Sequence, residues 1–467
     1  MSRLARPLAL LAVAGAALLG GCAEPMASPD AITAPVRTVH LATPATLSGR
    51  YLVSFRGTEP ADFATSVTAL GATIERRLPS VRAAILRNVN AAAAAALGAR
   101  SDLEGIAGDV GAQMIPAPVA TQRLSYTGAT TPRANGTDQS GAFFYPLQWN
   151  IRQVGADLAW GATPAGQGKL VCILDSGIDP DHLDLAGRVD PSLITSFVSD
   201  TSFPGNQDGL DYNAHGTSTA AYVVSNGFGV ASVAPDARLC SAKVLGVTGF
   251  GSYIDMVVAI LWATETAHAD VINLSLGGYF DQELPGAMQL LNIIQRAMDL
   301  ATKRGVVVVA AGGNMALNLD EDPRRFLFVP GQLRNVISVG ATAPFNQQNF
   351  DVLASYSNYG GRTGIDLVAP GGDFLPGGLL EDLVLSACSQ YQVTLPFACS
   401  AVDYLFSAGT SEATPHVSGA VAVVESQKAT PVSPATLTRC IIQGTDPVGP
   451  ASIYGAGRLN VLKAAGC

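Results

Sequence analysis

The chain has 467 residues, which is long enough for two or three domains, one of them large. Only 14% of its residues are charged and 48% are hydrophobic, and with 49 glycines this composition is typical of a well-packed α/β protein and excludes a disordered or coiled-coil chain. The net charge of −9, with no run of Lys or Arg, argues against nucleic acid or an anionic membrane surface as the main partner.

The N-terminus has the features of an export signal. Two arginines precede the apolar stretch 8–19, which is too short to be a full membrane-spanning helix. The stretch ends in LGGC, residues 19–22, which resembles the lipobox of bacterial lipoproteins. The resemblance implies a signal peptide over residues 1–21, a lipid on Cys22 and a precursor anchored in the bacterial cell envelope. Ala23 follows, so the aspartate linked with inner-membrane retention is absent and the outer membrane is expected. The alternative is a conventional signal peptide with an incidental cysteine.

If Cys22 carries lipid, six cysteines remain, an even number that is compatible with disulfides in an oxidising compartment. One pair brackets a short loop and another could pin the C-terminal tail; these disulfide candidates are Cys388 and Cys399, and Cys440 and Cys467. Cys172 and Cys240 lie in two apolar strand-like runs and are compatible with simple buried thiols. The sequence does not decide the connectivity.

Residues 22–49 are rich in Ala, Pro and Thr without apolar periodicity, and we expect a tether there. Residues 50–111 then show the order β-α-β-β-α-β, which is the ferredoxin-like pattern. The predicted strands are 51–55, 72–77, 83–89 and 106–110, and the predicted helices are 60–70 and 90–99. This unit contains no cluster of His, Cys or carboxylates, so we do not expect it to be an enzyme.

Residues 112–144 are again rich in Pro, Thr, Ala and Gly and predict a linker that is open to proteolysis. Over residues 145–467, apolar β-runs alternate with helical patterns, which predicts an α/β domain with a parallel sheet covered on both faces. The expected strands are 169–174, 237–244, 270–276, 306–311, 336–340 and 365–369, and the main helices are 253–267 and 286–304. Functional residues of such sheets gather at the carboxyl ends of the strands.

Three polar residues stand out at strand ends and helix starts. Asp175 ends a buried run, where a carboxylate needs a partner. His215 begins a small-residue helix, where the pKa of an imidazole is readily tuned. Ser411 lies in GTSEATPHVSGA, residues 409–420, at a helix start whose unpaired N–H groups favour a developing anion. A serine there is a candidate nucleophile if a base and an orienting acid come from elsewhere in the chain.

We expect the helix that carries Ser411 to be capped by Thr410 and to have Pro415 in its first turn, where a missing N–H costs little.

The chain order Asp, His, Ser and the flanking motifs resemble the subtilisin-like serine proteases, over essentially all of residues 145–467. The resemblance implies a subtilisin-like fold and a catalytic triad. Ser411 would attack the peptide carbonyl, His215 would take and return the proton, and Asp175 would hold the imidazole in the right tautomer.

A fourth catalytic position is implied by VVVVAAGGN, residues 306–314, which resembles the oxyanion-hole segment of the family. Asn314 would donate its side-chain amide to the oxyanion together with the N–H of Ser411. The alternative is an asparagine that only satisfies its own loop.

Substrate binding is implied by two segments that resemble the cleft-lining strands of the family, residues 247–253 and 273–278. Glycines there would let an extended substrate approach and pair through its main chain, and the pockets beside it would tolerate apolar side chains. The implied substrate-binding residues are Gly249, Gly251, Ser275, Leu276, Gly277, Gly278, Ala311 and Gly312. The same glycines could instead serve only as turns.

The segment ALGATIERRLPS, residues 69–80, resembles the inhibitor-type propeptide that precedes many secreted subtilases. It implies that residues 50–111 act as an intramolecular chaperone and inhibitor, with maturation by cleavage in residues 112–144. That cleavage would detach the peptidase domain from a lipid on Cys22. The alternative is a small interaction domain of the same fold.

Several features depart from the family pattern or are uncertain within it. Glu412 stands where the family usually has Met, and a carboxylate there would stabilise protonated His215 and shift the pH profile to alkaline values. Residues 372–407 are longer than the family core needs, and we expect a stapled surface loop near the active-site end that restricts large substrates. His182 and His416 are expected to be structural.

No cofactor is required for the chemistry that these motifs imply. Structural calcium is one reading of the oxygen-rich loop that contains Asp200, Asp208 and Asp211, although an EF-hand spacing is absent. The more ordinary interpretation is a solvated loop.

The sequence as a whole predicts a secreted serine endopeptidase that acts on peptides or proteins and is self-processed from a lipid-anchored precursor. The alternative, from another functional class, is a surface-anchored binding protein on the same fold with weak or no catalysis. All four catalytic positions hold the expected residue types, which favours the enzyme.

Overall fold

The computed structural model describes residues 45–115, 122–128, 138–161 and 165–467. The predicted signal peptide, most of the predicted tether and parts of the predicted linker lie outside these residues. Within the described ranges, no helix is both long enough and apolar enough to cross a membrane.

The N-terminal domain comprises residues 45–113, with the predicted β-α-β-β-α-β order. Its elements are β1 (Ala45–Phe55), α1 (Phe63–Ala69), β2 (Thr73–Leu78), β3 (Ala83–Arg87), α2 (Ala91–Gly98) and β4 (Leu103–Gln113). The strands are antiparallel in the order β2-β3-β1-β4, which is the ferredoxin-like arrangement. Its own core is built from apolar side chains of both helices and the facing strands, including Phe55, Phe63 and Leu97.

β4 extends past the predicted end of the domain and pairs antiparallel with β9 (Phe250–Ser252), so that β9 is the fifth strand of this sheet. The N-terminal sheet therefore includes a strand that is contributed by the second half of the chain.

The large domain is built on an eight-stranded sheet, which confirms the predicted α/β architecture. Its strands are β6 (Leu170–Asp175), β7 (Val189–Ser196), β8 (Arg238–Lys243), β10 (Val271–Leu274), β12 (Val307–Ala311), β14 (Val336–Phe345), β15 (Gln348–Leu353) and β16 (Leu367–Pro370). Their order is β15-β14-β12-β10-β6-β8-β7, with β16 paired to β14, and only β15 is antiparallel to its neighbour.

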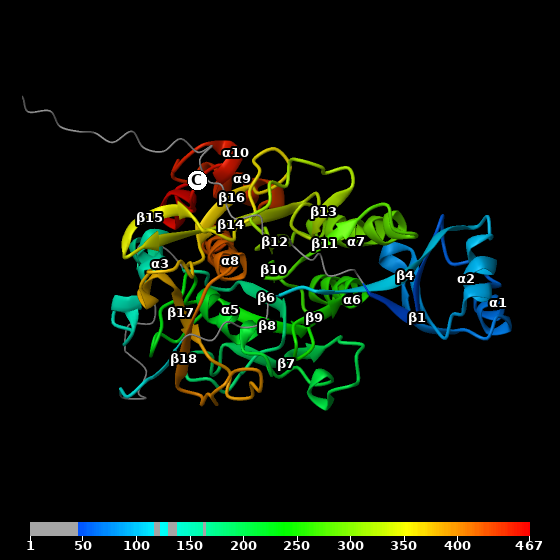
Figure 1. The fold of residues 1–467 in the computed structure, drawn as a ribbon, viewed down its shortest axis with the longest axis horizontal. Helices are drawn as coiled ribbons and strands as arrows, with labels where there is room; N and C mark the ends of the chain where they lie inside the picture. The colour runs from blue at the N-terminus through cyan, green and yellow to red at the C-terminus, as the bar shows by residue number, and fades with distance from the viewer. Residues whose placement is uncertain (1–44, 116–121, 129–137, 162–164) are drawn as a thin grey trace, which may run out of the picture. The chain divides into compact units, whose positions relative to one another are not determined.

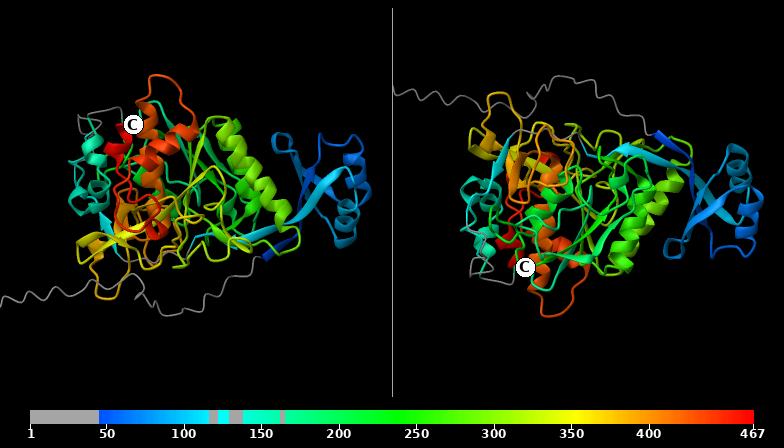
Figure 2. Two further views of the ribbon diagram at one scale, coloured as in Figure 1. Left: turned by 90° about the horizontal axis from the view of Figure 1, so that it is seen from above. Right: turned by 90° about the horizontal axis from the view of Figure 1, so that it is seen from below.

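Helices cover both faces of this sheet (Figures 1 and 2). α5 (His215–Val223) and α8 (Thr410–Ser426) lie on one face, and α6 (Tyr253–Glu265) and α7 (Ala287–Lys303) lie on the other. Successive residues of a strand alternate between the two cores: Val171 and Ile173 face α5 and α8, and Cys172 and Leu174 face α6 and α7. This explains why the strand sequences are apolar throughout.

Two small sheets and several short helices complete the domain. β11 (Gly278–Asp281) pairs with β13 (Phe326–Val329), and β18 (Asp403–Ser407) pairs with both β17 (Val384–Ala387) and β5 (Arg123–Ser125). The remaining elements of this domain are η3 (Tyr145–Leu147), α3 (Trp149–Gln153), α4 (Ala156–Ala159), η4 (Pro204–Asn206), η5 (Leu380–Asp382), α9 (Pro434–Gln443), α10 (Ala451–Tyr454) and α11 (Val461–Ala465). In the N-terminal domain, η2 (Pro79–Val81) lies between β2 and β3.

All six cysteines that follow Cys22 are paired. Cys388–Cys399 and Cys440–Cys467 form as predicted. The interpretation of Cys172 and Cys240 as simple buried thiols is wrong, because they are joined in a third disulfide. They are register partners on the adjacent parallel strands β6 and β8, which places both side chains on the same face of the sheet. The sequence does not contain this register, so it could not reveal the bond.

Candidate active site

Asp175 and His215 form a hydrogen-bonded pair at the carboxyl end of β6. His215 Nδ1 lies 2.7 Å from Asp175 Oδ1, which also accepts the N–H of Ser176 at 2.7 Å. Asp175 is fully buried and therefore has little freedom to move. Because Nδ1–H donates to the carboxylate, Nε2 is the ring nitrogen that can accept a proton, and it has no hydrogen-bond partner among the described residues.

The electrostatic surroundings of His215 favour its charged form. Burial lowers the pKa of the imidazole, but the charge and hydrogen bond of Asp175, followed by the charges of Glu412 and Asp211, outweigh this effect and raise the pKa to about 9. His215 is therefore a competent base mainly in the alkaline range.

Asp211 ties the start of α5 to the segment that carries Asp175. Its Oδ1 accepts the hydroxyl of Ser176 at 2.8 Å and the N–H of Ala214 at 2.9 Å, and its Oδ2 accepts the N–H of Thr217 at 2.8 Å. A carboxylate in this place also complements the positive end of the α5 dipole.

The oxygen-rich loop that contains Asp200, Asp208 and Asp211 uses these carboxylates for hydrogen bonds within the chain. Each of the three carboxylates accepts hydrogen bonds from residues of its own surroundings: Asp200 from Ser202, Asp208 from Leu210 and Tyr212, and Asp211 from the groups just described. Within the described part of the chain, no group of three or more His, Cys, Asp or Glu side chains is arranged to hold a metal ion.

Ser411 lies near the start of α8, which packs against α5. Its Oγ donates a hydrogen bond to Glu412 Oε2 at 2.7 Å, so the resting hydroxyl is directed to Glu412 rather than to His215. Both residues are only 4% exposed. The structure thus joins Asp175 to His215 directly and gives Ser411 a different acceptor, which the sequence patterns did not predict.

Two expectations about the start of α8 need correction. Gly409, not Thr410, is the N-cap, and the Thr410 hydroxyl instead donates to Asn314 Oδ1. Pro415 lies in the second turn rather than the first. Since proline has no N–H, the carbonyl of Ser411 is left without its helical donor and accepts the hydroxyl of Ser275 at 2.7 Å.

Asn314 follows β12 and is oriented by Thr410. Its Oδ1 accepts both the N–H and the hydroxyl of Thr410, at 2.9 and 2.7 Å, which leaves the amide NH₂ directed elsewhere. A Cβ on Gly409 would lie 2.8 Å from Ser411 Oγ, 3.3 Å from Asn314 Nδ2 and 2.5 Å from Glu412 Oε2. These three groups therefore face one small space, and only glycine leaves it open.

The two predicted cleft segments flank residues 111–115 of the same chain. β9 pairs with Gly111–Gln113, the N–H of Met114 donates to the carbonyl of Gly249 at 3.1 Å, and the N–H of Gly277 donates to the carbonyl of Met114 at 3.0 Å. An extended segment of the N-terminal domain thus lies where an extended substrate was expected.

The glycines of these segments provide the space for residues 111–115. A Cβ on Gly249 would lie 2.5 Å from Ile115 Cγ1, and one on Gly278 would lie 3.3 Å from the Cβ of Ala112.

The other predicted substrate-binding residues have mixed placements. A Cβ on Gly251 would lie 3.1 Å from Met114 Sδ, whereas the side chain of Ser275 does not face the cleft but anchors Ser411. Leu276, Ala311 and Gly312 are buried at or beyond the ends of β10 and β12.

Two other histidines are buried and hydrogen-bonded, as expected of structural residues. His182 Nε2 bonds the carbonyl of Asp403 at 3.0 Å. His416 Nδ1 bonds the carbonyl of Glu412 at 2.8 Å, and burial lowers the pKa of this imidazole to about 4, so it stays neutral.

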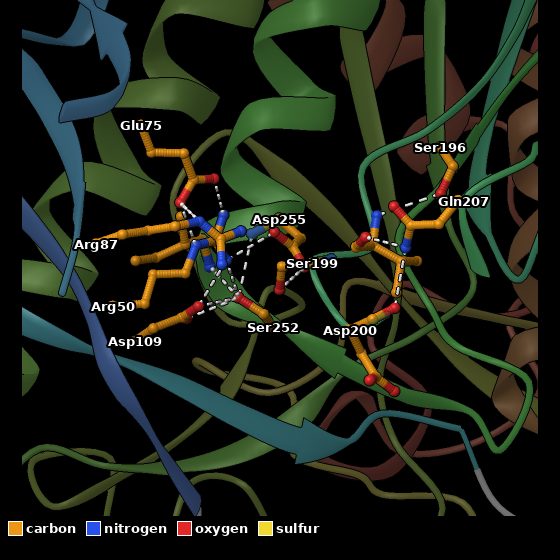
Figure 3. Close-up of polar contacts among 12 residues, drawn as sticks. Arg50, Glu75, Arg87, Asp109, Ser196, Ser199, Asp200, Gln207, Ser252 and Asp255 are labelled. Carbon is orange, nitrogen blue, oxygen red and sulfur yellow. Dashed lines mark hydrogen bonds and ion pairs between the residues drawn. The ribbon is translucent and has the colours of Figure 1, made fainter. Parts of the chain in front are cut away.

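One cluster of charged residues was missed by the sequence patterns (Figure 3). Arg50 of β1 is only 6% exposed, and its Nη1 lies 2.7 Å from Asp109 Oδ2 and 2.8 Å from Asp255 Oδ1 of α6. Its Nη2 lies 2.9 Å from Glu75 Oε1, and Asp109 also accepts the hydroxyl of Ser252, the N-cap of α6. These residues are dispersed in the sequence without a motif, so only the strand register and the contact with α6 bring them together.

Comparison with known proteins agrees with this geometry. The model of the subtilase family (Peptidase_S8) matches residues 166–457. The thermophilic serine proteinase of Bacillus sp. (strain AK1) is 30% identical over 327 residues, which cover 69% of this chain and 68% of the relative. Subtilisin Savinase of Lederbergia lenta is 33% identical over 316 residues, which cover 67% of this chain and 97% of the relative.

Solved structures show the same fold. The epidermin leader peptide processing serine protease of Staphylococcus aureus has a TM-score of 0.70 at 23% identity, with 89% of this chain and 97% of the other covered. Fervidolysin of Fervidobacterium pennivorans, a keratinolytic enzyme related to subtilisin, has a TM-score of 0.68 at 21% identity, with 90% and 61% covered. With the family match and the two sequence relatives, the chain belongs to the subtilase family and is a subtilisin-like serine endopeptidase.

Proposed function

We propose that the protein is a secreted endopeptidase that hydrolyses peptide bonds through Asp175, His215 and Ser411, with Asn314 as an oxyanion donor. The observation that carries the proposal is the bond from His215 Nδ1 to Asp175, with Nε2 left open to a proton. Ser411 Oγ attacks the peptide carbonyl while its proton passes to Nε2, which then protonates the leaving amine. A water molecule, deprotonated by the same nitrogen, releases the acyl group and restores the serine.

The oxyanion that forms in both steps is stabilised by the amide NH₂ of Asn314 and the N–H of Ser411. The fixed orientation of Asn314 by Thr410 supports this role, because a preorganised donor costs no reorganisation during the reaction. The position of Ser411 in the first turn of α8 supports the second donor, since N–H groups there have no helical partner.

The substrate is an extended peptide bound between β9 and the segment that contains Gly277. Residues 111–115 support this mode of binding, because they already make main-chain hydrogen bonds to both segments. Met114 and Ile115 are buried there, which favours substrates with apolar side chains in the corresponding positions.

The N-terminal domain acts as a propeptide that assists folding and inhibits the enzyme. Two contacts support this role: β4 extends the sheet into the cleft, and the Arg50 cluster joins β1 and β4 to the start of α6. While residues 111–115 occupy the cleft, an external peptide cannot pair there.

Maturation then cuts the chain after Ile115 and before Arg123, within the interval 112–144 expected from the sequence. Gly111–Gln113 pair with β9 and Met114 bonds Gly249, whereas β5 at Arg123–Ser125 pairs with β18, so the cut would separate two anchored segments. The precursor is exported by residues 1–21 and held by a lipid on Cys22, both of which lie outside the described residues, and the mature enzyme is released.

Labelling with a serine-directed fluorophosphonate tests the proposal. The processed wild-type protein should be labelled at Ser411, at a rate that rises with pH as His215 loses its proton. Labelling should be absent in Ser411→Ala. Absence of labelling in folded, processed wild type would instead favour a binding protein on the subtilase fold with weak or no catalysis. The hydrogen bond of Ser411 to Glu412, in place of one to His215, is the observation that favours this second candidate.

A further inference from the structure

The disulfide Cys388–Cys399 closes a loop, residues 388–399, that lies between β17 and β18 and packs on the turn preceding His215. The loop binds three consecutive carbonyls of that turn. Ser389 Oγ donates to the carbonyl of Asp211 at 2.6 Å. The N–H of Val393 donates to the carbonyl of Tyr212 at 3.0 Å, and Thr394 Oγ1 donates to the carbonyl of Asn213 at 3.2 Å.

The next residue of the turn, Ala214, needs support for its conformation. Its φ of 82° lies in the left-handed region, which an L-residue other than glycine adopts only at a cost. Ala214 is 3% exposed, and its methyl group shares a small apolar cluster with Cys388 and Cys399. The disulfide thus covers the strained residue that directly precedes the imidazole.

The same loop also holds the segment that follows Asp175. The N–H and the side-chain amide of Gln390 donate to Asp179 Oδ2 and Oδ1, at 2.9 and 3.1 Å. One closed loop therefore contacts both the segment that carries Asp175 and the turn that carries His215. The substrate-pairing residues Gly249 and Gly277 lie outside this loop, just before β9 and β11.

We propose that the loop 388–399 is a positioning element for the Asp175–His215 pair, and that the disulfide Cys388–Cys399 is required for the full catalytic rate. The inference rests on the catalytic roles proposed above. Opening the disulfide lets the loop sample conformations that lack the three carbonyl bonds, so that the turn through Ala214 relaxes and His215 moves. A displacement on the order of 1 Å at such a group can reduce the rate about 100-fold.

The experiment compares the processed wild type with two double variants. Cys388→Ala/Cys399→Ala removes the loop disulfide, and Cys440→Ala/Cys467→Ala removes the disulfide between α9 and the C-terminus as a matched control. The control bond spans 27 residues against 11, so chain entropy predicts that its loss lowers stability at least as much.

We expect the Cys388→Ala/Cys399→Ala variant to lose roughly 10- to 100-fold in kcat and in the rate of fluorophosphonate labelling, with KM within about threefold of wild type. The control variant should keep both rates while its Tm falls. Equal rates for wild type and the Cys388→Ala/Cys399→Ala variant would overturn the inference. It would also be overturned if both double variants lost kcat and labelling rate in proportion to their losses in Tm.

A milder variant keeps the test decisive if the double variant does not fold. Ser389→Ala retains the disulfide and deletes the bond to the Asp211 carbonyl, together with the bond that Ser389 Oγ accepts from the N–H of Tyr391 within the loop. We expect a several-fold loss in kcat with KM unchanged, and an unchanged kcat would again overturn the inference. Absence of labelling in wild type itself would refute the proposed function, which distinguishes that failure from failure of the present inference.

Discussion

Two carboxylates contact the proposed base and nucleophile of this site and have opposed effects on them. Asp175 binds His215 Nδ1 and orients the ring, whereas Glu412 accepts the hydroxyl of Ser411 and directs the nucleophile away from Nε2. Glu412 Oε2 also faces the space shared with Asn314 Nδ2, where a negative charge would oppose the oxyanion. We therefore expect Glu412 to slow catalysis at neutral pH compared with an uncharged residue.

Replacement of Glu412 by Met should move the acid limb of the pH–rate profile to lower pH. Burial lowers the pKa of His215, but Asp175, Glu412 and Asp211 together raise it to about 9, and the substitution removes one of these three charges. Only unprotonated His215 accepts a proton, so each unit by which its pKa falls raises the rate about tenfold at pH values below the limb.

The measurement is kcat/KM against pH for the mature proteins. Glu425→Gln, near the end of the same helix, is the control and should leave the acid limb in place. Acid limbs that coincide for wild type and Glu412→Met would contradict the role of Glu412.

The three residues of the proposed triad could be selected from sequence because each stands within its own local motif. Asp175 ends an apolar run, and His215 and Ser411 begin small-residue helices. The acceptor of the Ser411 hydroxyl could not be identified in this way, since it depends on a side-chain rotamer. The motif around Ser411 likewise led us to place Pro415 in the first turn, whereas α8 begins at Thr410 and Pro415 is its sixth residue, in the second turn.

Among the secondary-structure elements, β9 is the strand with which the proposed substrate would pair. It is a short strand with an open edge for main-chain pairing, and its partner here is β4. Gly249 lies just before β9 and has a φ of 80°. The three atoms nearest to a Cβ placed there all belong to Gln113 and Ile115. A side chain at this position would therefore act on the bound segment rather than on the sheet itself.

Gly249→Ala should slow self-cleavage and raise KM for extended peptides. The added Cβ meets Ile115 at 2.5 Å, and overpacking of this kind costs about 1–3 kcal/mol, or roughly 5- to 150-fold. Gly168→Ala is the matched control, because Gly168 has a similar φ of 76° but nothing within 4 Å of the Cβ position, so it reports the backbone strain alone. Equal maturation rates and KM values for the two variants would show that the contact with residues 111–115 has no effect.

The main strands and helices of both domains could be predicted from apolar patterns. The central strands of the large sheet carry a continuous apolar signal because they are buried on both faces. The register between strands could not, since it depends on contacts between segments far apart in the sequence. Cys172 and Cys240 illustrate this limit: both strands were identified, but their alignment across β6 and β8 was not. The ion pair of Arg50 with Asp255 shows the same limit, because it depends on a contact between two domains that the sequence does not reveal.

For the whole molecule, the Arg50 cluster is a buried contact between the two domains that depends on a single positive charge. Arg50 neutralises Asp109 and Asp255, each of which is at most 3% exposed. Burial raises the pKa of Asp109 to about 6, although the charge of Arg50 acts to lower it. Because the pKa of Asp109 is raised above its ordinary value of 3.8 when the N-terminal domain is docked on α6, this carboxyl favours docking at low pH. The contribution is lost as the pH rises through about 6.

Arg50→Ala should loosen the N-terminal domain from α6. Removal of one partner from a buried ion pair costs about 3–5 kcal/mol, so amide exchange in β4 and β9 should accelerate on the order of 100-fold or more, and most strongly above pH 6. The measurement uses the full chain with Ser411→Ala, which prevents self-cleavage. Arg77→Ala is the control, because Arg77 is 51% exposed and its ion pair with Glu59 is worth about 0–1 kcal/mol. Similar exchange rates in the two variants would contradict a specific role of Arg50.

The order of the segments along the chain predicts where the mature enzyme is found. The proposed lipid is on Cys22, whereas the proposed cut lies between Ile115 and Arg123, so cleavage separates the anchor from the peptidase domain. Ser411→Ala should remain full-length in the membrane fraction, and wild type should yield a soluble fragment whose first residue follows Ile115. Adding Cys22→Ala to Ser411→Ala should release an uncut chain, which shows that the lipid retains it. Wild type and Ser411→Ala that are equally uncut and equally anchored would reject self-processing as the route of release.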